Sequence, residues 1–255
     1  MIEVNREELR AKVQAVYQKV AEEPRGEFHF ELGRVLALKL GYPGELLEQI
    51  PPEALESFAG VGYHLDLAAL EPGEAVLDLG SGSGTDTFGA AVRVGPHGRA
   101  VGLDMTEAQR QKAHALKERA GFAQVEFCPG YIEEMPFADG SFDAVISNGV
   151  INLVPDKARV FREAARVLRP GGRLAISDIV SELEMPPSIT CNSNLWASCI
   201  GGAMQQDAYR RAVEEAGLKV VAWRENPQYA FLSKSAQGAS RTYGVKSVSL
   251  LAVNG

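Results

Sequence analysis

The chain has 255 residues, of which 45% are hydrophobic and 23% charged, proportions that are ordinary for a globular protein with a sizeable core. The formal net charge is −7 and no basic run occurs, which argues against nucleic acid as the main partner because phosphate binding calls for a basic stripe. Neither a bilayer-spanning apolar stretch nor a signal-peptide core is visible, so we expect a cytoplasmic protein without a membrane partner, and the sequence leaves the oligomeric state open.

The N-terminal part of the chain shows helical patterns and no strand pattern. Apolar residues recur at helical spacing over 6–22 and again over 32–40, and proline and glycine interrupt the chain after each stretch. We therefore predict a helical N-terminal cap over 1–60, followed by a second domain over 61–255.

From residue 75 onward, short apolar stretches alternate with helical patterns. The strand candidates are 75–79, 99–103, 124–128, 143–147, 172–177, 218–223 and 246–253. Thr106 and Gln109 have the spacing of a capping box, which predicts a helix start there. Residues 226–245 show no clear helix or strand, and we expect either a loop that shapes a substrate pocket or a plain excursion before the last strand. The alternation predicts an α/β fold, with a mostly parallel sheet between two layers of helices.

The stretch from Val76 to Gly84 combines a buried strand with a tight turn. Gly80, Gly82 and Gly84 follow the strand at every second position, and glycine lets backbone N–H groups approach a small molecule because it has no Cβ. Asp104 ends the next strand candidate, at roughly the separation at which an acid accepts hydrogen bonds from ribose hydroxyls. The turn therefore predicts a nucleotide-type ligand.

The details of this turn favour a cationic ligand over a dinucleotide. Nicotinamide and flavin folds use G-x-G-x-x-G, whereas the pattern here is G-x-G-x-G with Thr85 at the usual third small position. Asp78 stands just before the turn, where it attracts an ammonium or sulfonium group. NAD remains an alternative ligand, and a binding measurement can distinguish it from a cationic ligand.

Four segments in order resemble the class I S-adenosylmethionine-dependent methyltransferases: LDLGSGSGTD, GLDMT, GYIEEMPFADGSFDAVIS and VFREAARVLRPGGRLAISD. The resemblance covers about 75–180. It implies a Rossmann-like class I methyltransferase sheet, mostly parallel with the last strand antiparallel, and S-adenosyl-L-methionine as the cofactor. It also implies a small-molecule substrate.

The resemblance assigns cofactor-binding roles by position. Asp78, Gly80, Ser81 and Gly82 correspond to contacts with the methionine end, and Asp104 to the contact with the ribose diol. The remaining correspondences are Met105 on the adenine face, Ile132 and Glu133 at the adenine edge, and Asn148 near the methionine moiety.

A narrower resemblance, to the arsenite methyltransferases, rests on SNGVINLVPDKARVFREAARVLRPGGRLAISD, on LWASCIGGA and on LGYPGELLEQIP. That family binds trivalent arsenic through cysteine thiolates, which are soft ligands suited to a thiophilic centre. This chain keeps one of the family's core cysteine positions, Cys199, while Tyr63 and Gly149 stand at the other two.

Cys191 is the candidate for a second thiolate. On one straight helix it would lie about 12 Å from Cys199 along the axis, so a shared arsenic(III) site requires a bent or looped segment. Asn192 and Ser193 are plausible N-cap residues that permit such a bend. No site for a resident metal is expected.

Three functions remain open from the sequence. The first is an arsenite methyltransferase-like enzyme, the second a methyltransferase of a small organic metabolite, and the third a non-catalytic S-adenosylmethionine-binding module. An oxygen, nitrogen or carbon nucleophile usually needs a general base, for which His64 is the first candidate, with His29 and Asp178 behind it.

Overall fold

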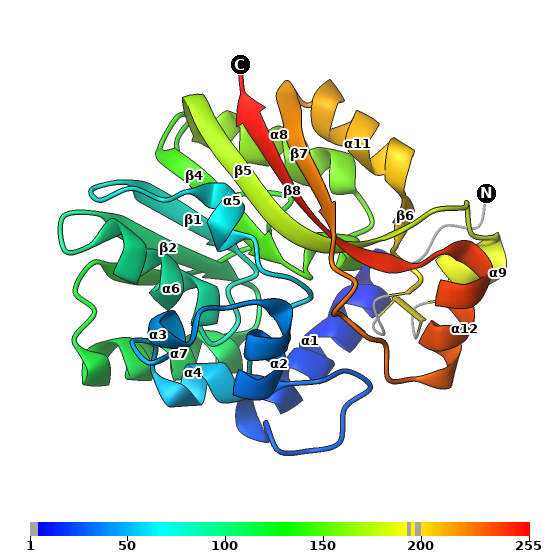
Figure 1. Cartoon of the computed structure of the whole chain (residues 1–255), viewed down its shortest axis with the longest axis horizontal. Helices are drawn as coiled ribbons and strands as arrows, with labels where there is room; N and C mark the ends of the chain where they lie inside the picture. Colours follow the sequence, from blue (N-terminus) through cyan, green and yellow to red (C-terminus); the bar gives the residue numbers. More distant parts are fainter. Residues whose placement is uncertain (1–4, 193–194, 197–199) are drawn as a thin grey trace.

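The computed structural model describes residues 5–192, 195–196 and 200–255, and one mixed β-sheet forms its centre (Figure 1). The strands are β1 (Ala75–Leu79), β2 (Arg99–Asp104), β3 (Val125–Pro129), β4 (Phe142–Asn148), β5 (Leu168–Ser181), β6 (Met204–Gln205), β7 (Leu218–Glu225) and β8 (Lys246–Asn254). Their order is β3-β2-β1-β4-β5-β8-β7, with β6 beside β5. Strand β8 runs antiparallel to β5 and β7, and the other pairs are parallel. The predicted mostly parallel sheet with an antiparallel last strand is confirmed.

Helices cover both faces of this sheet. They are α1 (Arg6–Glu22), α2 (Gly33–Leu40), α3 (Gly44–Leu47), α4 (Pro52–Glu56), α5 (Leu65–Ala68), α6 (Thr85–Val94), α7 (Glu107–Ala120), the 3-10 helix η1 (Ile151–Leu153), α8 (Lys157–Val167), α9 (Pro187–Thr190), α11 (Gln206–Glu215) and α12 (Lys234–Tyr243). Alternate strand residues point to opposite faces, so Val76 packs with α2–α7, whereas Leu77 packs with α8 and α11. Among the residues described, no helix is both long and apolar enough to cross a bilayer.

A third apolar cluster lies beyond the carboxyl ends of the strands. It joins Leu9 and Val13 of α1 to Leu153 of η1, to Trp196 and Ile200, and to the small residues of α12. Figure 1 shows α1 between the α2–α4 group and the α9–α12 side of the molecule. This cluster, called the roof below, therefore covers the sheet edge at which the glycine turn lies.

Two local predictions were wrong. Residues 226–245 contain the helix α12, which begins where Ser233 Oγ accepts a hydrogen bond from Ala236 N at 3.2 Å. Its buried face consists of alanines, so a search for large apolar residues misses it. The helix α7 begins at Glu107 as expected, but Gln109 takes no part in a capping box. The Gln109 side chain instead bonds Ser83 Oγ at 2.5 Å and Tyr17 O at 2.8 Å.

Candidate functional site

The turn between β1 and α6 depends on its glycines. Gly80, Gly82 and Gly84 have φ values of 70°, 54° and 94°, a region that L side chains rarely adopt. A Cβ at Gly80 would lie 2.5 Å from the Val150 side chain, whereas at Gly82 it would meet nothing closer than Gln109 Oε1 at 3.7 Å. Gly82 therefore presents bare backbone to open space.

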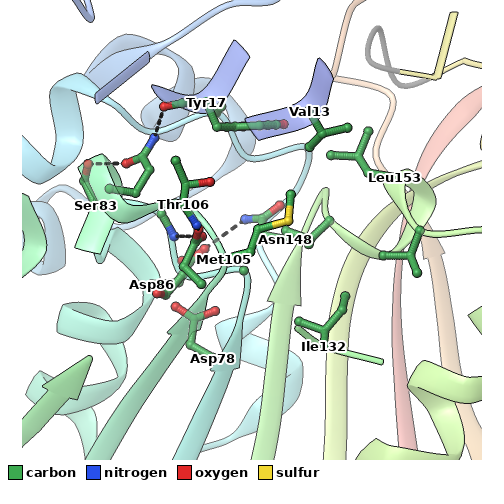
Figure 2. A pocket seen from close by; sticks show the side chains of 18 of the residues that line it. Val13, Tyr17, Asp78, Ser83, Asp86, Met105, Thr106, Ile132, Asn148 and Leu153 are labelled. Atoms are coloured by element: carbon green, nitrogen blue, oxygen red, sulfur yellow. Dashed lines mark hydrogen bonds between the residues drawn. The ribbon is translucent and has the colours of Figure 1, made fainter. Parts of the chain in front are cut away.

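That open space is a cleft with an empty volume of about 1050 Å³, which includes the solvent-filled space at its open mouth. It is lined by every residue that the sequence assigned to cofactor binding: Asp78, Gly80, Ser81, Gly82, Asp104, Met105, Ile132, Glu133 and Asn148. They converge because β1, β2 and β4 are parallel neighbours whose carboxyl ends share one edge of the sheet. Figure 2 shows Met105 and Asn148 between the acids below and α1 above.

Two buried acids stand at the β1–β4 end of the cleft. Asp78 is 3% exposed and accepts a hydrogen bond from Thr87 Oγ1 at 2.6 Å. Burial, and then the nearby carboxylate of Asp86, raise the pKa of Asp78 well above its ordinary value. Asp86, which is 6% exposed, accepts hydrogen bonds from Tyr42 and Asn148. Two acids buried together repel each other, so this end of the cleft favours a cation.

A third acid stands at the β2 end. Asp104 Oδ2 accepts a hydrogen bond from Gly82 N at 2.9 Å, and Oδ1 accepts one from Thr106 N at 2.7 Å. Burial raises the pKa of Asp104, and these backbone donors oppose the rise. The Thr106 side chain also bonds this carboxylate. The carboxylate keeps acceptor capacity that a hydroxyl group of a ligand can use.

The helix α1 forms the outer wall of the cleft through Arg10, Val13 and Tyr17. Arg10 bonds Glu133 at 2.9 Å and lies 4.4 Å above the ring of Tyr131, so it bridges to the segment after β3. The Gln109 bond to Tyr17 O holds the middle of the helix. These polar contacts keep the wall in place over the glycine turn.

The predicted catalytic residues are placed differently. His64 is fully buried outside the cleft lining, its ring nitrogens have no partner in the described part of the chain, and burial lowers its pKa. The other two base candidates, His29 and Asp178, also lie outside the lining. Cys191 is half-buried at the end of α9, beyond the lining, and Cys199 lies outside the described residues. The structure therefore brings the cofactor-binding candidates together and leaves the catalytic assignments as predictions.

Residues that the sequence reasoning missed are Asp86, Tyr42 and the α1 wall. Asp86 follows Gly84 by two positions, so an acid in the first turn of the helix after the glycines was a usable signal. Tyr42 lies in the LGYPGELLEQIP segment, but nothing local in the sequence indicates its contact with Asp86, which stands 44 positions later.

Comparison with known proteins identifies the domain. A family model described as "Methyltransferase domain" matches residues 70–217. An arsenite methyltransferase of Halobacterium salinarum is 42% identical over 183 residues, which cover 72% of this chain and 46% of that protein. The human arsenite methyltransferase is 45% identical over 138 residues, 51% of this chain and 37% of that one. The chain spans about half the length of the curated relatives that it matches, or less.

Solved structures agree on the fold. The crystal structure of an arsenic(III) S-adenosylmethionine methyltransferase from Chlamydomonas reinhardtii has a TM-score of 0.64 and 32% identity, covering 88% of this chain and 74% of that one. A geranyl diphosphate C-methyltransferase from Streptomyces coelicolor has a TM-score of 0.66 at 17% identity, covering 95% and 98%, which supports the fold alone. The Rossmann-like fold expected from the sequence is confirmed. Since the family model matches more than half of the chain, the protein belongs to the methyltransferase domain family.

Proposed function

We propose that this protein transfers a methyl group from S-adenosylmethionine to a small acceptor, and that trivalent arsenic is the first acceptor to test. The observation that carries the cofactor proposal is the set of buried acids around the glycine turn. Asp78 and Asp86 suit the sulfonium and ammonium charges, and Asp104 suits a ribose diol.

The cleft also fits this cofactor in shape and in hydrogen bonding. Gly82 leaves room for a ligand to approach the backbone closely. The Asp104 carboxylate, which lines the cleft, can accept a hydrogen bond from a ligand hydroxyl group. The same acids disfavour the pyrophosphate of NAD, because like charges repel.

When bound, S-adenosylmethionine supplies a methyl group on a positively charged sulfur. The chain then has to align an acceptor with that methyl and exclude water. The roof suits both tasks, because Val13 and Leu153 present apolar side chains to the cleft. Gln14 Nε2 bonds Met105 O at 3.4 Å and so connects α1 with the segment that follows β2.

Two observations favour an arsenic acceptor. Apart from the acids already described, the cleft lining in the described part of the chain offers no histidine or lysine as a general base, and an arsenic lone pair needs none. The relatives named above are arsenite methyltransferases. Thr190, beside Cys191, accepts a hydrogen bond from Trp196 Nε1 at 2.6 Å, which joins this thiol's segment to the roof.

One observation favours the second candidate, a small organic acceptor. Gly149 and Tyr63 stand where the arsenite family has cysteines. Gly149 has a φ of 72° and its Cβ would approach Val61 Cγ1 to 3.1 Å, so a side chain there would be strained. Tyr63 packs against Tyr42 with ring centroids 4.6 Å apart. The local fold is therefore adapted to residues without a thiol at both positions.

Calorimetry and labelled methyl transfer test these proposals in order. S-Adenosylhomocysteine should bind and NAD should not; binding of NAD alone would refute the cofactor proposal. With arsenite and excess thiol, wild type should form methylated arsenic, and the double variant Cys191→Ser, Cys199→Ser should not. Cys128→Ser is the matched control, since Cys128 lies in β3 and not in the segment after α9, and burial raises the pKa of its thiol. Arsenic methylation by the double variant would refute the two-thiolate site.

The same assay separates the remaining functions. The organic-acceptor function would be established if the double variant transferred label to an organic acceptor and the wild-type protein did not methylate arsenic. Cofactor binding without transfer to any acceptor would point to a binding module. We also propose that residues 1–60 form a cap on the domain at 61–255, and that the protein acts in the cytoplasm.

A further inference from the structure

A buried hydrogen-bonded group connects the N-terminal helices to the cleft. Tyr42 Oη donates to Asp86 Oδ1 at 2.5 Å. Asn148 Nδ2 is within hydrogen-bond distance of Tyr42 Oη at 3.0 Å and of Asp86 Oδ2 at 3.1 Å. Asp86 and Asn148 line the cleft, whereas Tyr42 stands behind them and is 3% exposed. Each oxygen of the Asp86 carboxylate thus has a donor, Tyr42 from behind the lining and Asn148 from within it.

The local fold gives the Tyr42 hydroxyl little freedom. The helix α2 ends at Gly41, whose φ is 100°, and Tyr42 N then donates to Ala37 O at 3.0 Å. The Tyr42 ring packs against Phe58 and Tyr63, with centroids 5.1 Å and 4.6 Å away. A buried hydroxyl needs a partner, and this one has a carboxylate.

The position of Asp86 in the cleft indicates what it binds. It shares the β1–β4 end with Asp78, while Asp104 and Met105 lie at the β2 end. If Asp104 binds the ribose, the amino-acid portion of the cofactor extends toward Asp86. The α-ammonium group is the cation that this portion carries.

We propose that Asp86 binds the α-ammonium group of the cofactor and that Tyr42 is a positioning residue that acts through Asp86. This inference rests on the proposed function, because it takes S-adenosylmethionine as the ligand. It makes the segment around α2 part of cofactor recognition, although that segment precedes residues 70–217, which the methyltransferase family model matches.

Two ligands separate this role from a general effect on the fold. S-Adenosylhomocysteine carries the ammonium group, whereas methylthioadenosine is an uncharged thioether without the amino-acid portion. Tyr42→Phe removes only the hydroxyl and should weaken S-adenosylhomocysteine binding about tenfold, the size expected for one hydrogen bond to a charged group. Binding of methylthioadenosine should change less than about twofold.

Tyr209→Phe is the matched control. Tyr209 Oη is also buried and donates to a carboxylate, Asp178 Oδ2 at 2.7 Å, but both residues lie outside the cleft lining. This variant should keep the wild-type affinity for both ligands. In turnover with S-adenosylmethionine, Tyr42→Phe should raise KM with kcat nearly unchanged.

A double-mutant cycle tests whether Tyr42 acts through Asp86. In an Asp86→Asn background, Tyr42→Phe should cost less than about twofold in S-adenosylhomocysteine affinity. An equal loss in both backgrounds, or an equal loss for both ligands, would overturn the proposal. So would wild-type affinity of Tyr42→Phe for S-adenosylhomocysteine. If the wild-type protein binds neither ligand, the proposed function itself fails, an outcome distinct from these.

Discussion

Alanine at Gly82 and alanine at Gly84 are expected to damage different properties of the protein. Both glycines have left-handed φ values, 54° and 94°, and an L-residue in this region costs about 1–2 kcal/mol. At Gly84 the added Cβ would lie 2.7 Å from Phe127 Cζ and 2.9 Å from Phe88 Cε2, both buried. Overpacking of a core adds about 1–3 kcal/mol. Gly84→Ala should therefore lose about 2–5 kcal/mol of unfolding free energy.

The Cβ at Gly82 meets open cleft instead of core. Gly82→Ala should lose only about 1–2 kcal/mol of stability, but its methyl occupies the space of the proposed cofactor and should weaken S-adenosylhomocysteine binding at least about tenfold. Urea denaturation measures the first quantity and calorimetry the second. At a temperature where it is folded, Gly84→Ala should keep its affinity within about threefold. The reasoning would be refuted if Gly82→Ala bound S-adenosylhomocysteine with wild-type affinity. It would also be refuted if Gly82→Ala lost as much unfolding free energy as Gly84→Ala.

Three further outcomes are expected. Burial raises the pKa of Asp178 to about 6, so the folded state holds the Asp178 proton more tightly than the unfolded state does. The free energy of unfolding should therefore fall by about 3 kcal/mol as pH rises from about 4 to 6. In Asp178→Asn, the midpoint of urea denaturation should no longer show this dependence on pH. Arg10→Ala should change the unfolding free energy by less than about 1 kcal/mol, because its ion pair with Glu133 is part-exposed. Arg166→Ala should lower the free energy of unfolding by about 2 kcal/mol. It should also speed amide hydrogen exchange over 135–139, because Arg166 donates to the Met135 and Phe137 carbonyls and to the Asp139 carboxylate.

Seven of the eight strands in the described part of the chain were predictable because each carries a local signal, whereas the two-residue strand β6 was not predicted. The β1 sequence is apolar apart from Asp78 and stands before a glycine turn, as expected for a parallel strand buried on both faces. The glycine turn and Asp104 were predictable as part of one site because parallel strands bring their carboxyl ends to one edge, whereas Asn148 was assigned through the family resemblance. Asp104 and Asn148 lie far apart in sequence yet line the same cleft.

What could not be predicted depends on contacts between distant segments. The contact of Tyr42 with Asp86 arises from the way the α2 segment packs on α6, and no local pattern encodes it. The proximity of His64 to Tyr63 in sequence suggested an active-site position, but the chain turns into α5 there and buries the imidazole. Neighbours along the chain need not share a surface, whereas ends of parallel strands must share an edge.

The charge of the cleft predicts that cofactor binding releases protons. In the ligand-free protein, burial and the Asp86 carboxylate raise the pKa of Asp78, so part of the population is protonated above the usual carboxyl range. A bound cation favours the ionised form and lowers that pKa. Affinity should therefore increase as pH rises from the ordinary carboxyl pKa to the raised one, and level off above it.

Calorimetry in buffers of different ionisation enthalpy counts the protons released in that window. Asp78→Asn should reduce the release while keeping the shape of the side chain. An anionic ligand such as a pyrophosphate predicts the opposite sign, because it would favour protonated Asp78 and bind more weakly as pH rises. Proton uptake on binding of S-adenosylmethionine would thus contradict the placement of its positive charge beside Asp78, even if the affinity were high.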